Sequence, residues 1–220
     1  FRSLEFFCEQ VGIKPIFGLE LDVLYAGSSE QAPLVALARN AQGYANLLRL
    51  ASLQTPVPLG QLLEFARGLV FLEGGEGGRV SQLVQSRKLA EAQHLLDWYN
   101  AEFGSDFYLR YDLGQSVDLF SVFPTEQFVL CQDVRWSHDQ SAAHEALHVL
   151  SQIGRREGVY PPFPLLSWES LTKRFMGPPG VIENTLELAA MCNVSLPRER
   201  ILPPHPDGHS LGDLVWSGAQ

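Results

Sequence analysis

The segment 12–21, GIKPIFGLEL, most constrains the fold because it joins the end of a helix to the start of a strand. Gly12 stands where a helix ends in left-handed geometry, and Pro15 favours an extended backbone at the residue before it. We therefore predict a β run in which Glu20 emerges at the strand end. Before this segment, four apolar residues recur at helical spacing and form one stripe of an amphipathic helix, namely Leu4, Phe7, Cys8 and Val11.

Strand patterns and helix patterns alternate along the rest of the chain. Such alternation predicts an α/β fold with a mostly parallel sheet. The predicted strands cover 21–25, 34–37, 69–72, 107–111 and 128–131. The predicted helices cover 40–50, which Asn40 caps, and 61–66, 80–103, 139–153, 168–175 and 181–192.

The composition limits the classes of function. With 45% hydrophobic and 19% charged residues, the chain of 220 residues can bury a core. Its net charge of -9 argues against a broad basic surface for duplex DNA in this segment. The three cysteines are far apart, which favours a reducing cytoplasm over a disulfide framework. No apolar run reaches the length of a membrane span, so we expect no membrane contact.

A glycine-rich loop, EGGEGG, occupies residues 73–78 between a predicted strand and a predicted helix. Loops in this position can hold a phosphate through backbone N–H groups. This one lacks the GK[ST] ending of a P-loop and carries two acidic residues that would repel phosphate. We interpret it as a permissive turn.

The sequence HEALH at 144–148 matches the H-E-x-x-H pattern of zinc peptidases. In that chemistry His144 and His148 would bind zinc, and Glu145 would act as general base. Both histidines point away from the apolar stripe of the predicted helix, and the third-ligand extension of the metzincins is missing. A zinc metallopeptidase is therefore an alternative, and a solvated helix face is the simpler interpretation.

Several blocks together resemble the PHP domain of bacterial C-family DNA polymerases, the alpha subunits of DNA polymerase III, including their error-prone branch. The blocks occur in the order of that family and span nearly the whole chain. They are GIKPIFGLE at 12–20, LARNAQGYANL at 37–47, GLVFLEGG at 68–75, QDVRW at 132–136, HEAL at 144–147, IENTLELA at 182–189, and the tail 204–219.

The resemblance implies a PHP-type distorted (β/α)7 barrel with a trinuclear metal site at its strand ends. By position, Glu20 and Asp133 match metal ligands. Pro33 falls where His is usual, Gly75 where Cys is usual, and Arg135 where a second His is usual. Proline and glycine side chains cannot coordinate a metal, and arginine is a permanent cation. We therefore expect a degenerate metal site in which Arg135 pairs with one of the two carboxylates.

The resemblance also predicts the organisation of the chain. Residues 1–160 would form a PHP-like domain that lacks its first strands, and residues 161–220 a helical extension leading toward a polymerase core that lies outside this segment. The partner would be the remainder of the polymerase chain, which would contact DNA and use Mg²⁺ for DNA synthesis. We expect no cofactor in the segment itself. The alternative within this family is a phosphoesterase or 3'-5' exonuclease that uses divalent metals.

Overall fold

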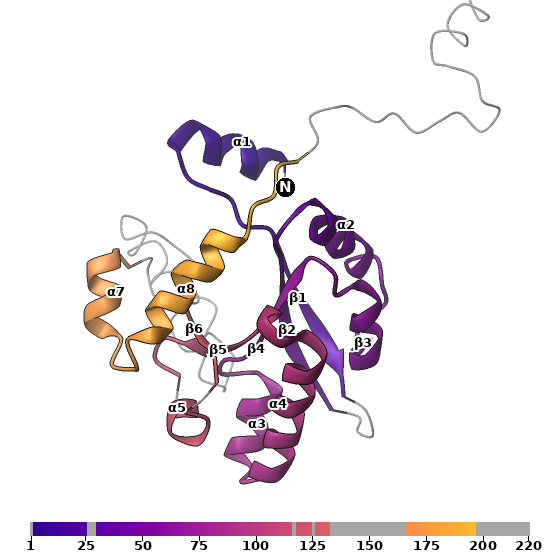
Figure 1. Cartoon of the computed structure of the whole chain (residues 1–220), viewed down its shortest axis with the longest axis vertical. Coiled ribbons are helices and arrows are strands. Elements are labelled where there is room, and N and C mark those ends of the chain that lie inside the picture. The colour runs from indigo at the N-terminus through magenta and orange to yellow at the C-terminus, as the bar shows by residue number, and fades with distance from the viewer. Residues whose placement is uncertain (1, 26–29, 116–117, 125, 133–165, 197–220) are drawn as a thin grey trace, which may run out of the picture.

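The computed structural model describes residues 2–25, 30–115, 118–124, 126–132 and 166–196 (Figure 1). Its strands are β1 (Gly18–Leu24), β2 (Gln31–Ala38), β3 (Val57–Pro58), β4 (Leu69–Gly74), β5 (Phe107–Asp112) and β6 (Phe128–Cys131). Its helices are α1 (Arg2–Val11), α2 (Ala41–Leu50), α3 (Arg79–Gln85), α4 (Leu89–Phe103), α5 (Leu119–Val122), α7 (Trp168–Arg174) and α8 (Gly180–Met191), with 3-10 segments η1 (Leu59–Phe65) and η2 (Gly104–Asp106). Within these ranges, no helix combines the length and apolar character needed to cross a lipid bilayer.

The described strands form one six-stranded sheet in the order β3-β1-β2-β4-β5-β6. β2 runs antiparallel to both of its neighbours, and the other pairings are parallel. Five of the six described strands thus run in the same direction, so the sheet is mostly parallel, as predicted, with β2 as its antiparallel strand. A short connection between β1 and β2 permits only a hairpin, because a parallel pair needs a long crossover. The α/β class is confirmed, whereas closure into a barrel and the absence of first strands remain predictions.

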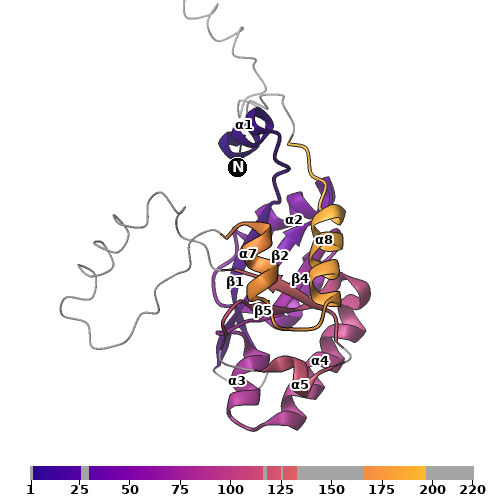
Figure 2. The same cartoon turned by 90° about the vertical axis from the view of Figure 1, so that its left-hand side faces the viewer.

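Helices cover both faces of the sheet (Figures 1 and 2). The larger core lies between one face and helices α2, α3 and α4, and includes Leu50, Leu83, Tyr99 and Phe71. A smaller core lies on the other face, where Leu188 of α8 packs with strand residues such as Val70, Leu72 and Tyr108. Helix α8, which belongs to the predicted helical extension, is thus packed on the sheet. The predicted boundary at residue 160 lies outside the described residues.

The predicted helix ends follow from their capping residues. Asn40 caps α2 by accepting a 3.0 Å hydrogen bond from the Gly43 N–H. Gly12 has a φ of 68° after α1, and Ile13 N–H donates to the Cys8 carbonyl. The predicted helix 80–103 is two helices instead, because Arg87 adopts a left-handed φ of 59° and terminates α3.

The apolar stripe of α1 is present but is not buried in the described structure. Leu4, Phe7 and Val11 are all exposed, whereas Cys8 is half-buried. The helix lies at one end of the molecule beside the last described residues (Figure 1). It is tied there by Glu5, whose carboxylate accepts a 2.8 Å hydrogen bond from the Leu196 N–H.

Candidate functional site

The predicted ligand Glu20 lies on the face of the sheet that carries α8. The strand register aligns Glu20 with Val35, Val35 with Leu72, and Leu72 with Tyr108. Aligned residues share a face of the sheet. Glu20 is the third residue of β1 and not its last, so the prediction of a strand-end carboxylate is wrong. Its side chain is 60% exposed.

Two further charged residues of β5 lie on this face. Side chains alternate along a strand, so Arg110 and Asp112 point to the same side as Tyr108. Arg110 Nη1 donates to Glu20 Oε2 at 3.3 Å, and Arg110 Nε donates to Asp112 Oδ1 at 2.6 Å. One guanidinium therefore joins carboxylates from β1 and β5. These strands have two others between them, which indicates that this face is concave.

The loop after β4 fits closely around Asp112. Gly75 N–H donates to the Arg110 carbonyl at 2.8 Å, and Glu76 N–H donates to Asp112 Oδ2 at 3.0 Å. Gly75 has a φ of 69°, a region that favours glycine. A Cβ at this position would lie 2.3 Å from Asp112 Oδ2. The space that a cysteine side chain would need is therefore taken by the Asp112 carboxylate.

The other predicted positions divide into those that the structure describes and those that it does not. Pro33 lies in β2, aligned with Asp22 of β1, where it offers no metal donor. Residues Asp133 and Arg135 lie outside the described residues, as does 144–148 with its two histidines. Their roles, including the predicted ion pair of Arg135, remain predictions. In the described part, Arg110 makes the kind of ion pair that we expected of Arg135.

The donor chemistry of this face suits an ion-pair network better than a metal centre. Arg110 already engages Glu20 and Asp112, and a guanidinium repels a cation. Cys131 ends β6 in register with Asp112. Burial raises the pKa of the Cys131 thiol to about 11, although Arg110 lowers it, so the thiol is protonated at neutral pH. Across the described ranges, no three His, Cys, Asp or Glu side chains cluster in a way that could hold a metal.

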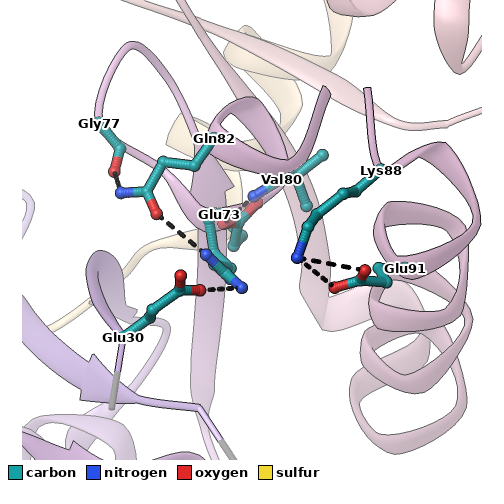
Figure 3. Close-up of polar contacts among 8 residues, drawn as sticks. Glu30, Glu73, Gly77, Val80, Gln82, Lys88 and Glu91 are labelled. Atoms are coloured by element: carbon teal, nitrogen blue, oxygen red, sulfur yellow. Dashed lines mark hydrogen bonds and ion pairs between the residues drawn. The ribbon is translucent and has the colours of Figure 1, made fainter. Parts of the chain in front are cut away.

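The opposite face of β4 holds a buried carboxylate that the sequence analysis did not single out. Glu73 is fully buried, and its Oε1 accepts a 3.0 Å hydrogen bond from the Val80 N–H at the start of α3 (Figure 3). Its Oε2 has no hydrogen-bond partner among the described residues. Burial raises the pKa of Glu73 to about 7, although the N–H groups of α3 and the charge of Arg79 oppose this shift.

The position of Glu73 explains why the glycine-rich loop does not form a phosphate cradle. The loop turns back so that the Glu73 carboxylate takes the place of an anion at the start of α3. Gly74 and Gly75 have positive φ values of 106° and 69°, as a tight turn requires. These observations agree with the interpretation of residues 73–78 as a permissive turn.

Sequence reasoning did not identify Arg110, Asp112 or Glu73. The alternation in 107–111 indicated a strand, and extending it by one residue would have placed Arg110 and Asp112 on the same face as Tyr108. Glu73 follows four buried apolar residues of β4 and carries no sequence signal that distinguishes a buried carboxylate from a turn residue.

Comparison with known proteins identifies the family. Residues 3–111 match the PHP domain model. The chain is 28% identical to the DNA polymerase III subunit alpha of Caulobacter vibrioides over 94% of this chain and 21% of that protein. It is 31% identical to the same subunit of Pasteurella multocida, over 90% of this chain and 19% of that protein. It is 27% identical to an error-prone DNA polymerase of Symbiobacterium thermophilum, over 96% of this chain and 23% of that protein.

The chain spans about a fifth of the length of these relatives. The similarity nevertheless extends beyond the segment that matches the family model, through the region that contains α7 and α8. Residues 3–111 therefore form a PHP domain, within a chain related to the alpha subunits of bacterial DNA polymerase III.

Proposed function

We propose that this chain is the PHP portion of a C-family DNA polymerase and that it serves as a structural domain with a degenerate metal site. The observation that carries this proposal is the Arg110 guanidinium, which binds both Glu20 and Asp112. A permanent cation at this position provides charge balance without a metal. Glu20 and Asp133 are then remnants of a ligand set that is insufficient for a tight transition-metal site, because such sites depend on imidazole or thiolate donors.

The reaction of the whole polymerase would be template-directed DNA synthesis, with Mg²⁺ held by residues outside this segment. The partner of the segment is then the remainder of the polymerase chain. DNA would be contacted mainly there, because the segment carries a net charge of -9, which opposes binding to phosphates. We assign no catalytic residue to the segment.

Primer extension tests the proposal that DNA synthesis is carried out by residues outside this segment. We incubate the purified chain with a primed template, dNTPs and Mg²⁺, and expect the primer to stay unextended. DNA synthesis needs carboxylates that hold two metal ions around the nucleotide, and we propose that these lie outside this segment. Sustained extension that depends on the template would contradict the proposal.

A phosphodiesterase assay tests the alternative exonuclease function. We expect hydrolysis of bis(p-nitrophenyl) phosphate with added Mn²⁺ to remain at background, both in the unmodified chain and in Glu20→Gln. Hydrolysis that is lost in Glu20→Gln would show an active metal site and would favour the exonuclease. A rate of hydrolysis that is equal in both proteins does not depend on Glu20 and would point to a contaminating enzyme.

A further inference from the structure

A cavity of about 650 Å³ lies on the helical side of the molecule, away from the Arg110 network. Its apolar walls come from η1, α3 and α4 and include Leu59, Leu83, Leu95 and Trp98. Its size falls within the range of pockets that hold small ligands, about 300–1,000 Å³. Such pockets combine apolar walls with a few well-placed polar groups, and this cavity has that character.

The buried charge in the cavity wall is Arg79, the first residue of α3, whose side chain is only 11% exposed. Nη1 donates to Gln82 Oε1 at 3.3 Å, and Nη2 pairs with Glu30 (Figure 3). The guanidinium carbon also lies 5.9 Å from the centre of the Tyr25 ring. These contacts fix the orientation of the guanidinium. A guanidinium carries five N–H donors, so these two partners leave donors for a further acceptor.

The acidic groups near the cavity lie at its edge or behind its wall. Glu91 lines the cavity, but it is largely exposed and pairs with Lys88 at 3.3 Å. Glu30 is also more than half exposed. Glu73 lies behind the wall, and burial raises its pKa to about 7, which lowers its average negative charge at neutral pH. The charged group in the buried part of the wall is therefore a cation, Arg79.

We infer that this cavity binds a small amphipathic carboxylate, with its apolar body against Leu83, Leu95 and Trp98 and its carboxylate at Arg79. Carboxylates match the planar guanidinium fork better than other small anions of single charge. The apolar body would displace water from the leucine and tryptophan side chains, which is favourable. This inference does not depend on the proposed role in a polymerase.

The site can be tested by isothermal titration calorimetry with octanoate and with octanol, its uncharged analogue of the same chain length. We expect octanoate to bind the intact chain at one site and octanol to bind at least about tenfold more weakly, because only octanoate can bond with Arg79. In Arg79→Gln, octanoate should lose about tenfold in affinity, whereas octanol should be unchanged.

A second variant tests the location of the site. Gly60 lines the cavity, and a Cβ there would meet no atom within 4 Å, so Gly60→Leu can fill the space without strain in the backbone. We expect this variant to weaken octanoate binding by at least about tenfold. Gly180→Leu is the matched control, since a Cβ at Gly180 in α8 also meets no atom within 4 Å. It should leave octanoate affinity unchanged.

Three results would overturn the inference. They are the absence of octanoate binding by a chain that melts cooperatively, equal affinity for octanoate and octanol, and full octanoate affinity in Gly60→Leu. Thermal melting of each variant establishes that it is folded. If Gly60→Leu does not fold, the ratio of octanoate to octanol affinity in Arg79→Gln still decides, and an unchanged ratio would contradict the site.

Discussion

The two faces of the sheet around β4 and β5 differ in the surroundings of their carboxylates. On the face that carries α8, Glu20 and Asp112 are bound by the Arg110 guanidinium. On the other face, Glu73 is fully buried, with one bonded oxygen and one that has no partner among the described residues. The first arrangement pairs both carboxylates with a cation, whereas burial in the second raises the pKa of Glu73 and favours its protonated form. The same sheet thus separates an ion-pair network from a carboxyl group whose pKa is raised by burial to about 7.

The largest expected effect concerns the buried side of this comparison. Burial raises the pKa of Glu73 from 4.5 to about 7, so the folded chain binds more protons than the unfolded chain between these values. The free energy of unfolding should therefore fall as the pH rises from 4.5 to 7, by about 3 kcal/mol from this group. Glu73→Gln should lack this contribution. Urea denaturation of both proteins at pH 5 and pH 8 measures it.

Relative to the unmodified chain, Glu73→Gln should gain stability on going from pH 5 to pH 8. Glu169→Gln is a suitable control, because Glu169 is exposed and pairs only with Lys173 in the same helix among the described residues. If the unmodified chain and Glu73→Gln had parallel stability profiles, Glu73 would not be a buried acid of raised pKa.

The next effect concerns the close fit around Asp112. Gly75→Ala should lower the free energy of unfolding by about 2 kcal/mol, because a Cβ is strained at a φ of 69° and would lie 2.3 Å from Asp112 Oδ2. Gly60→Ala, whose Cβ meets no atom within 4 Å, should be close to neutral or slightly stabilising. Thermal and urea denaturation provide the comparison. Equal stability of the two variants would show that Asp112 does not occupy the space at Gly75.

A smaller effect is expected for the ion-pair network. Arg110→Gln should cost about 1 kcal/mol, because the pairs are partly exposed and each surface pair contributes little. The loss should shrink at high salt, which screens the exposed pair with Glu20. Lys173→Gln removes a largely exposed pair and should cost less than about 0.5 kcal/mol. If Arg110→Gln were no more costly than Lys173→Gln, Arg110 would not hold this face together.

Local sequence signals predicted much of the fold. Gly12, Asn40 and Gly104 mark helix boundaries through backbone geometry or capping, and the structure has helix ends at all three. The signals did not predict the break at Arg87, because a left-handed arginine is unfavourable on its own and is held by the packing of α3 and α4. The signals also did not predict that β2 runs opposite to the other five described strands, because strand direction depends on how the segments pair.

The candidate site was predicted less well, for a related reason. The resemblance placed Glu20 on a ligand position, and the alternation in β5 indicated which face its residues occupy. The partner of Glu20 depends on the curvature of the sheet, which brings Arg110 across two intervening strands. No local pattern encodes that distance. The burial of Glu73 is likewise a property of how α3 returns to β4.

The most direct test of the central claim is the metal content of the purified chain. Inductively coupled plasma mass spectrometry, on protein purified without chelator or added metal, should find zinc, manganese and iron well below one equivalent. The melting temperature should not change with EDTA, because Arg110 supplies the positive charge that Glu20 and Asp112 require. More than one tightly held metal ion per chain, lost together in Glu20→Ala or in Asp133→Ala, would show an intact metal site and would contradict the account.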